Sequence, residues 1–399
     1  MREIDLKIRF RGWMIKIRYP LPSTVKDLKL SFESMTTLSS AGLILVCRGR
    51  MLLDDCSLES LGDNSVILIM SNQRNLVLDN FPKDRREFMF ESLFCFKSLT
   101  LLSVCGNEIS GIPPAIGDLP FLVEFRVANN HLTSLPSEIS LLRELRIFIA
   151  NNNCFAELPP ILLTLEKLEL VELSHNELSC LPVQIGNLTK LRRLVADYNK
   201  INCIPSSIGR CSSLKEVSLI HNLLVHLPNM LDASEAVEFS ETLHLFLHKN
   251  QLRELPSWVG SLQFLRILNL SGNELTRLPD EIGSLENLEQ LSANNNRINR
   301  LPSSIGSCRS LQLLSLAMNS LVELPDSLSM LTNIEELDLR CNSGLAALPQ
   351  NMFLTCTNLK RIHLWRTEIQ YDNLTLYAGW REGLTNYLPS LGDKTDMDD

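Results

Sequence analysis

LRILNLSGNELTRLPDEIGSLEN, residues 265–287, is the stretch of the chain that decides its fold. Leucines and isoleucines stand two or three residues apart, an asparagine follows at position 273, and a Leu-Pro pair follows at 278–279. The same spacing returns 23 residues later, with Asn296 and the pair Leu301-Pro302. A fixed period of this length predicts a stack of similar coils and not one compact core.

Asparagines mark successive coils along the chain. They stand at positions 107, 130, 153, 176, 199, 222, 250, 273, 296, 319 and 342. Every step is 23 residues except the step from Asn222 to Asn250, which is 28 residues and predicts a five-residue insertion after Pro228. The unit reads L-x-x-L-x-L-x-x-N-x-L-x-x-L-P-x-x-I-G-x-L and resembles the leucine-rich repeat, in particular the form found in intracellular Ras-group scaffolds. A twelfth unit, with Thr367 in place of the asparagine, is expected to end the array.

The spacing within a unit predicts how each coil is built. Leu268 and Leu270 lie two residues apart, the period of a strand, so they face the core while Asn269 between them faces out. The asparagine after the strand is expected to be buried, with its amide bonded to the turn backbone of its own and the adjacent coil. The proline lacks a hydrogen-bond donor, which places it in the outer segment and not in the inner strand. Stacked coils of this kind predict a curved solenoid.

Residues 1–72 do not fit the repeat and predict a separate domain. Apolar and polar residues alternate on both sides of a turn at 11–13, which predicts a hairpin. Thr24 is placed to cap a helix with an apolar face. Strands at 43–47 and 66–70 complete the order β-β-α-β-β.

This order resembles ubiquitin-like β-grasp domains, with Gly49-Arg50-Met51-Leu52 and Asp54-Asp55 followed by Ser57-Leu58. The resemblance implies a hydrophobic recognition patch, which falls on Val46, Ile67 and Ile69 with Arg50 beside it. The last strand runs on into the chain without a free diglycine end, so we expect a docking module and not a conjugated tag. The two halves together resemble plant proteins that carry leucine-rich repeats and a ubiquitin-like domain, which implies protein binding and names no partner.

The expected fold class is an α+β ubiquitin-like β-grasp domain followed by a leucine-rich-repeat α/β solenoid, or horseshoe. The expected domains are the ubiquitin-like domain (1–72), a linker and N-terminal cap (73–98), about 12 repeats (99–366), a C-terminal cap (367–388) and an acidic disordered tail (389–399).

Composition narrows the class of partner. The formal net charge is -8, and the acidic residues are not offset by a basic stripe of the kind that nucleic acid requires. The eleven cysteines are scattered, and the first residues lack a secretory apolar core, so a reducing compartment, cytoplasm or nucleus, is expected. No run of eighteen apolar residues is free of charge, so no membrane span is expected. Protein partners are favoured, and the oligomeric state stays open.

Candidate binding residues follow from the outward positions of the strands, which lie six, four, two and one residues before each asparagine. Mixed charge with aromatic side chains is typical of a protein interface. The expected concave-face residues are Arg126, Glu172, His175, Arg193, Asp197, Tyr198, Glu216, His221, His244, Phe246, His248 and Lys249.

The resulting hypothesis is a non-enzymatic adaptor without cofactor, metal site or catalytic residues. The concave face binds a client protein, and the ubiquitin-like domain docks on receptors of the ubiquitin and proteasome pathway. The alternative is a signalling scaffold for small GTPases or phosphatases, because Ras-binding domains share the β-grasp topology. A metal site at the histidines is disfavoured because they are expected too far apart for zinc: His175 and His221 lie two coils apart, and His244 and His248 lie four residues apart on one strand. A pH-sensitive interface and an unmarked enzyme stay as further alternatives.

Overall fold

The computed structural model describes residues 2–10, 13–21, 23–35, 43–47, 50–51, 65–70, 74–80, 97–228 and 242–369, together with Leu374 and Gly379. The described chain divides into two compact units. The first is Met1–Phe155 with Pro159–Leu168, and the second is Ala156–Leu158 with Glu169–Asp399. Each unit is described by itself below.

A five-stranded sheet and one helix form the N-terminal part of the first unit. The sheet order is β2-β1-β5-β3-β4, with β1 and β2 paired as a hairpin, β1 and β5 parallel, and β3 antiparallel to both β4 and β5. The elements are β1 Arg2–Phe10, β2 Trp13–Leu21, α1 Val25–Met35, β3 Leu43–Cys47, β4 Arg50–Met51 and β5 Ser65–Met70. The predicted hairpin, helix and later strands are therefore present, and the sequence missed only the short strand β4.

Helix α1 begins at a capping box. The backbone N–H of Asp27 donates to Thr24 Oγ1 at 3.3 Å, and the backbone N–H of Thr24 donates to Asp27 Oδ2 at 2.7 Å. These bonds satisfy N–H groups that a helix start leaves unpaired, and they lower the pKa of the Asp27 carboxyl. Val25 and Leu28 are fully buried, which confirms the predicted apolar face.

Strands β6 to β18 follow one another in a 13-stranded sheet in chain order. Adjacent strands within each unit pair in parallel. The first unit holds β6 Asn75–Val77, β7 Leu101–Ser103, β8 Glu124–Arg126 and β9 Ile147–Ile149. The second unit holds β10 Leu170–Glu172, β11 Arg193–Val195, β12 Glu216–Ser218, β13 Leu243–Phe246, β14 Leu265–Asn269, β15 Gln290–Ser292, β16 Leu313–Ser315, β17 Glu336–Asp338 and β18 Arg361–His363.

Buried asparagine side chains join successive coils, as the sequence predicted. The Nδ2 of Asn296 donates to the carbonyls of Leu270 in the preceding coil at 3.0 Å and of Ala293 in its own coil at 3.1 Å. Its Oδ1 accepts the backbone N–H of Leu275 at 3.0 Å. Asn199, Asn273 and Asn342 repeat all three bonds. One amide per coil thus satisfies polar backbone groups that the turn would otherwise bury unpaired.

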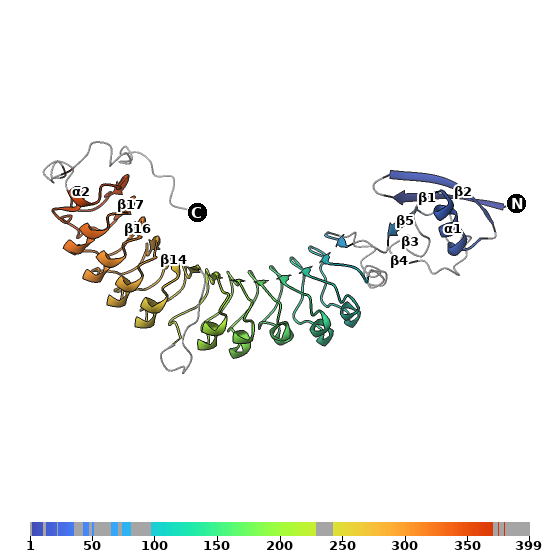
Figure 1. The fold of residues 1–399 in the computed structure, drawn as a ribbon, viewed down its shortest axis with the longest axis horizontal. Coiled ribbons are helices and arrows are strands. Elements are labelled where there is room, and N and C mark those ends of the chain that lie inside the picture. The colour runs from blue at the N-terminus through green and yellow to red at the C-terminus, as the bar shows by residue number, and fades with distance from the viewer. Residues whose placement is uncertain are drawn as a thin grey trace. The chain divides into compact units, whose positions relative to one another are not determined.

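Short 3-10 helices lie opposite the strands in the described coils from β7 to β12 and from β13 to β17 (Figure 1). Proline stands at or next to the N-cap of each, with its φ fixed near -70°, so the predicted outer segment has regular structure where the sequence indicated only a loose one. These helices are η5 Pro114–Asp118, η6 Ser137–Leu141, η7 Pro160–Thr164, η8 Val183–Asn187, η9 Ser206–Arg210, η10 Ser257–Ser261, η11 Asp280–Ser284, η12 Ser303–Ser307 and η13 Asp326–Met330; an α-helical turn, α2 Met352–Thr355, follows.

The glycine of the Ile-Gly pair sets how closely these helices stack. A Cβ on Gly283 would lie 2.3 Å from the carbonyl oxygen of Ser304, and a Cβ on Gly306 would lie 2.2 Å from that of Ser327. Both distances are shorter than van der Waals contact. Glycine at this position therefore lets the backbone of one helix contact the next.

The predicted insertion leaves the asparagine bonds intact. Asn250 Nδ2 donates to Leu219 O at 2.8 Å, and Asn250 Oδ1 accepts from Leu224 N at 3.0 Å, although five more residues than usual separate the partners. Beyond the insertion, Leu243 pairs with Leu265 while His244 pairs with Ile267, so β14 has one extra residue there. The inserted stretch itself, 229–241, lies outside the described residues.

The parallel sheet extends beyond the predicted repeats at its N-terminal end. The first repeat was expected at Leu99, but β6 already pairs with β7. The spacing Leu76-x-Leu78 matches Leu102-x-Val104 and carried this signal. Residues 81–96, the larger part of the predicted cap, lie outside the described residues.

The last coil substitutes a hydroxyl for the asparagine amide. Thr367 Oγ1 donates to Leu364 O at 2.7 Å, a bond to the carbonyl three residues back that the asparagines also make. Leu374, in the predicted C-terminal cap, is buried. Apart from Leu374 and Gly379, the predicted cap beyond residue 369 and the predicted tail 389–399 lie outside the described residues.

Candidate functional site

Every predicted inner-face residue lies on a strand or in the turn directly after one. Glu172, Arg193, Glu216, His244 and Phe246 lie on strands β10 to β13. Asp197, His248 and the residues just before each asparagine lie beyond the strand ends, so the expectation that His244 and His248 share one strand is wrong. Arg126 lies on β8 in the first unit, where its guanidinium contacts Glu124 at 2.5 Å.

The residue before each asparagine has a positive φ. Five of the eleven coils use asparagine or glycine there: Gly106, Asn129, Asn152, Gly272 and Asn295. Such residues adopt the left-handed region at little cost, whereas bulky side chains are strained by about 1 kcal/mol. Three successive coils of the second unit have aromatic residues at this position, namely His175, Tyr198 and His221, with φ values of 55°, 53° and 56°.

These three rings form what we call the aromatic column. The rings of His175 and Tyr198 stack with centroids 4.4 Å apart and an interplanar angle of 8°, and those of Tyr198 and His221 stack at 4.7 Å and 22°. Tyr198 is 42% exposed, and so is Leu223 beside the column. Stacking fixes the rings in place before any partner arrives, so their side-chain entropy is already lost. A rigid, exposed row of amphipathic rings is suited to contact with another protein.

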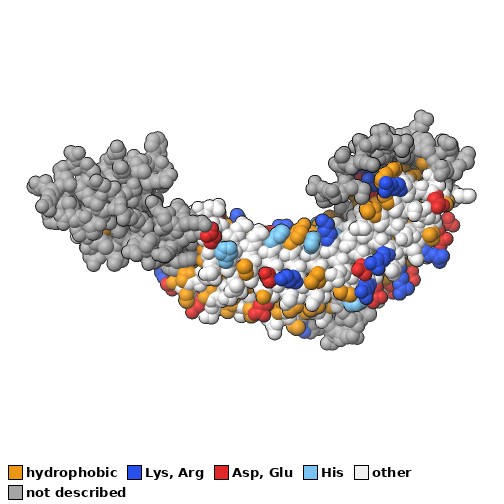
Figure 2. Space-filling model, turned by 180° about the vertical axis from the view of Figure 1, so that it is seen from behind, with side chains coloured by type: hydrophobic (Ala, Val, Ile, Leu, Met, Phe, Trp, Pro, Cys, Tyr) orange, Lys and Arg blue, Asp and Glu red, His pale blue; other side chains and the backbone are white. Residues whose placement is uncertain are grey.

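An ion triad lies on the strands below the column. Arg193 contacts Glu172 at 3.3 Å and Glu216 at 2.9 Å, so one guanidinium bridges two coils. Lys and Arg side chains also lie beside Asp and Glu side chains on the face drawn in Figure 2. Exposed ion pairs of this kind stabilise a fold by less than about 1 kcal/mol, so the main effect of the triad is to hold its three side chains in position.

Asp197 makes bonds inside the fold that the sequence did not reveal. Its Oδ1 accepts from Ser218 Oγ at 2.7 Å and from the backbone N–H of Ile220 at 2.8 Å. Asn294 makes the same two bonds in a later coil, from Ser315 Oγ at 2.7 Å and the backbone N–H of Ala317 at 2.8 Å. The fold therefore requires a side-chain oxygen that accepts hydrogen bonds at this position, and it does not require a negative charge.

The next coil adds two histidines of different character. His244 lies edge-on to Phe246, with ring centroids 6.4 Å apart. His248 is half-buried, and its Nδ1 has no hydrogen-bond partner among the described residues. Burial lowers the pKa of His248, against the opposing influence of Asp197, so this imidazole favours the neutral form.

A second cluster of charged and aromatic residues, which the sequence analysis missed, lies on the last two coils. Glu336 is bonded by Arg361 and by His363 Nε2, the latter at 3.2 Å, and these partners hold the pKa of its carboxyl below the usual value. The guanidinium of Arg366 lies 4.1 Å from the ring centroid of Trp365, within the range of a cation–π contact. The outward spacing already applied to the central coils, counted from Asn342 and Thr367, would have found these residues.

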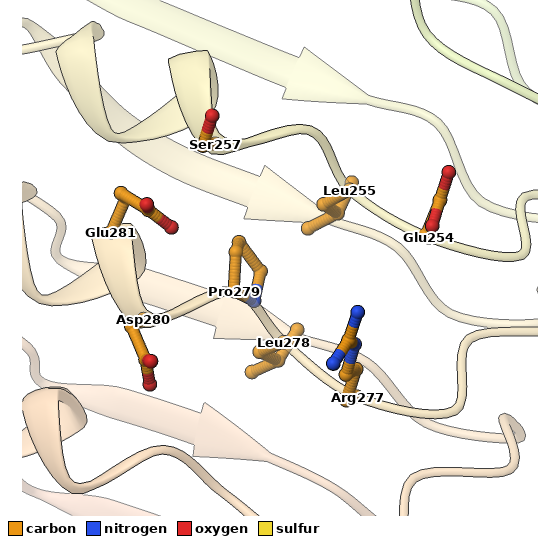
Figure 3. A pocket seen from close by; sticks show the side chains of 8 residues that line it. All are labelled: Glu254, Leu255, Ser257, Arg277, Leu278, Pro279, Asp280 and Glu281. Atoms are coloured by element: carbon orange, nitrogen blue, oxygen red, sulfur yellow. The ribbon is translucent and has the colours of Figure 1, made fainter.

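A depression of about 320 Å³ lies between two neighbouring coils (Figure 3). Glu254 and Arg277 lie at one end of it, and Asp280 and Glu281 lie at the other. It is formed where two Leu-Pro segments adjoin, so its walls are the repeating parts of the coil. Its residues include no nucleophile beside a base, and we assign it no chemistry.

The described residues contain no group of three or more His, Cys, Asp or Glu arranged to hold a metal ion. Burial raises the pKa of the Cys211 and Cys308 thiols to about 12, so neither is a reactive thiolate near neutral pH. Within the described ranges, no helix has the length and apolar character needed to cross a membrane.

The predicted docking patch of the N-terminal domain is placed by its backbone alone. Val46 on β3 pairs with Ile67 on β5, and Ile69 pairs with Ile44. Arg50 begins β4 and pairs with Cys47. The side chains of these residues lie outside the part of the structure that is described, so the patch stays a prediction.

The coils, their asparagine bonds and their parallel sheet define a leucine-rich-repeat protein. The chain matches the family described as leucine-rich repeat region over residues 73–259 and 243–388, and it belongs to that family. No curated protein matches its sequence.

Solved structures share the fold. A leucine-rich-repeat protein of Leptospira interrogans is 26% identical, with a TM-score of 0.52, and the match covers 76% of this chain and 86% of that one. The internalin InlF of Listeria monocytogenes is 21% identical with a TM-score of 0.63, covering 76% and 85%. A structure of PEPR1-AtPEP1 is 25% identical with a TM-score of 0.60, covering 74% of this chain and 42% of that one. Proteins of this family generally mediate protein–protein interaction.

Proposed function

We propose that this protein is a non-enzymatic adaptor whose aromatic column binds a segment of a client protein. The observation that carries the proposal is the use of aromatic rings at three successive positions where asparagine or glycine is the unstrained choice. Bulky residues held in the left-handed region are typical of functional sites, and here three of them in successive coils are also stacked ring on ring.

A single substitution tests the column. Tyr198→Asn places at this position the residue that Asn129 and Asn295 already provide elsewhere, so the coil is expected to fold. Met318→Asn is the matched control, because Met318 has the same backbone conformation, with φ of 56°, and is 41% exposed on another coil. Full-length baits are compared by affinity capture from cell extract and quantitative mass spectrometry.

We expect the wild type and Met318→Asn to retain the same client, and Tyr198→Asn to lose it by about tenfold or more, as for an interface hot spot. A thermal melt of each bait shows whether the fold is intact. Equal retention by the wild type and Tyr198→Asn contradicts the proposal.

The second part of the proposal concerns the N-terminal domain. We propose that it is ubiquitin-like and docks on receptors of the ubiquitin and proteasome pathway through Val46, Arg50, Ile67 and Ile69. Support comes from the sheet order β2-β1-β5-β3-β4, in which the first and last strands are parallel neighbours. One chain with two binding surfaces raises the effective concentration of client near receptor, in the cytoplasm or nucleus.

The rival role, a scaffold for small GTPases or phosphatases, uses basic residues of the hairpin and helix such as Arg9, Lys16 and Lys29. Two variants of the full chain separate the roles. Val46→Asp with Ile67→Asp removes receptor capture under the adaptor role, whereas Arg9→Glu with Lys16→Glu removes GTPase capture under the scaffold role. Retention of receptors by the first variant contradicts the docking proposal.

A further inference from the structure

The charges around the aromatic column are unbalanced. On the strands and turns of the three coils that end at Asn176, Asn199 and Asn222, the outward positions carry three carboxylates and one guanidinium. The guanidinium is that of Arg193, and it is already shared between Glu172 and Glu216. The triad of one guanidinium and two carboxylates keeps one negative charge, and Asp197, which lies outside the triad, adds a second.

The charge of Asp197 has no structural use. Both hydrogen bonds that its side chain accepts within the fold are accepted by Oδ1, and both donors are neutral. Asn294, which is itself neutral, accepts the same two bonds in its own coil. No described residue donates a hydrogen bond to Asp197 Oδ2. The residue is half-buried, so a formal charge there is partly desolvated, and no Lys or Arg among the described residues forms an ion pair with it.

Apolar surface adjoins this carboxylate. Ile220, whose backbone N–H donates to Asp197 Oδ1, is half-buried on the neighbouring coil, and Tyr198, the residue after Asp197, is exposed. A half-desolvated carboxylate next to apolar and aromatic side chains is complementary to a cation next to an apolar group.

We infer that the segment bound by the column presents an arginine or lysine side chain to Asp197 Oδ2, next to an apolar side chain that contacts Ile220 and Tyr198. Lys249, exposed at the equivalent turn position of the coil that follows the column, repels a second cation there. This inference rests on the proposed function of the column and specifies the partner's chemistry.

The test selects partners without assuming one. A library of random short peptides displayed on phage is selected against the immobilised full-length protein at low salt and near neutral pH. The most enriched peptides are synthesised, and their Kd values are measured by fluorescence anisotropy. We expect enrichment of Arg or Lys beside an apolar residue.

Three variants of the full chain then assign the contact. Asp197→Asn keeps the internal bonds, as Asn294 shows, and removes only the charge; we expect it to weaken binding about tenfold and to make binding less sensitive to salt. Asp326→Asn, an equal charge change on the exposed start of η13, is the control and is expected to bind as the wild type does.

The third variant, Tyr198→Asn, separates the two proposals. If it loses binding while Asp197→Asn binds within about twofold of the wild type, or if the selected peptides lack basic residues, the inference is wrong and the column remains a docking site. If Tyr198→Asn binds as tightly as the wild type, or if no peptide is enriched, the proposed function itself is contradicted.

Discussion

The side-chain oxygen of Asn199 accepts the backbone N–H of Leu178 at 2.9 Å, a bond that spans two coils. The same side chain donates to Leu173 O at 2.9 Å and to Ala196 O at 3.1 Å. Three buried backbone groups thus depend on one amide, and the asparagine is a structural residue at the centre of its turn.

Replacement of this amide is expected to destabilise the second unit strongly. Asn199→Ala leaves buried donors and acceptors unpaired, which costs about 3 kcal/mol in the free energy of unfolding. Asn333→Ala is the control. Exposed Asn333 donates one hydrogen bond from Nδ2 to Arg309 O at 2.8 Å, so its replacement is expected to cost less than about 1 kcal/mol. Urea unfolding followed by circular dichroism measures both, and equal losses contradict the structural role.

Close stacking of the 3-10 helices predicts that alanine substitutions at two glycines change stability in opposite directions. Gly283→Ala drives a methyl group into the Ser304 carbonyl, and overpacking of this kind costs about 1–3 kcal/mol. Gly111→Ala has no atom within 4 Å of the new methyl group and is expected to raise stability by about 0.5 kcal/mol through the unfolded state. Thermal melts distinguish them, and a neutral Gly283→Ala shows that the helices can move apart.

The pKa of His248 predicts a pH-dependent stability. Because burial lowers the folded pKa below the ordinary value of 6.5, the unfolded chain binds more protons than the folded one in this window. The stability contributed by His248 is therefore fully present above pH 6.5, and it is lost as the pH drops below 6.5 through the lowered folded pKa. The effect is below about 1 kcal/mol because solvent screens a half-buried group.

His248→Phe removes this titration and is the variant that checks it. Urea midpoints measured across the same pH window are expected to fall less for His248→Phe than for the wild type. His244→Phe, on the same coil, serves as the control for loss of a histidine. An identical slope for the wild type and His248→Phe assigns the pH dependence to other groups.

The capping box predicts a local effect in the N-terminal domain. Thr24→Ala removes an acceptor for the Asp27 N–H and is expected to destabilise α1 by about 1 kcal/mol. Lys26→Ala, one residue away and exposed, is expected to change little. Amide hydrogen exchange of residues 25–30 reports the local stability, and unchanged protection in Thr24→Ala shows that the cap contributes nothing measurable.

Sequence periodicity predicted the repeat architecture because its signal is physical and redundant. The strand period, the buried asparagine and the proline each follow from a hydrogen-bonding or steric need that recurs in every coil. The spacing also placed Glu172, Arg193 and Glu216 on neighbouring strands, where they form the ion triad.

The features that the sequence did not predict depend on contacts between side chains, and residue spacing does not encode these contacts. Nothing in the sequence around Asp197 shows that its oxygen is bonded to Ser218, and the stacking of Tyr198 between two histidines requires the turn geometry of three coils. Strand β6 was missed because the sequence has phenylalanine at position 81, where the asparagine used to count the repeats would stand.

The asparagine bonds on either side of the stretch between Pro228 and Leu243 have a practical consequence. Leu224 and Asn250 form the same bond as their counterparts in other coils despite the additional residues between them, so the length of chain at this point is not constrained by the coils. A peptide tag or fluorescent reporter inserted there adds to a segment that the protein already accommodates, and it leaves both chain ends free.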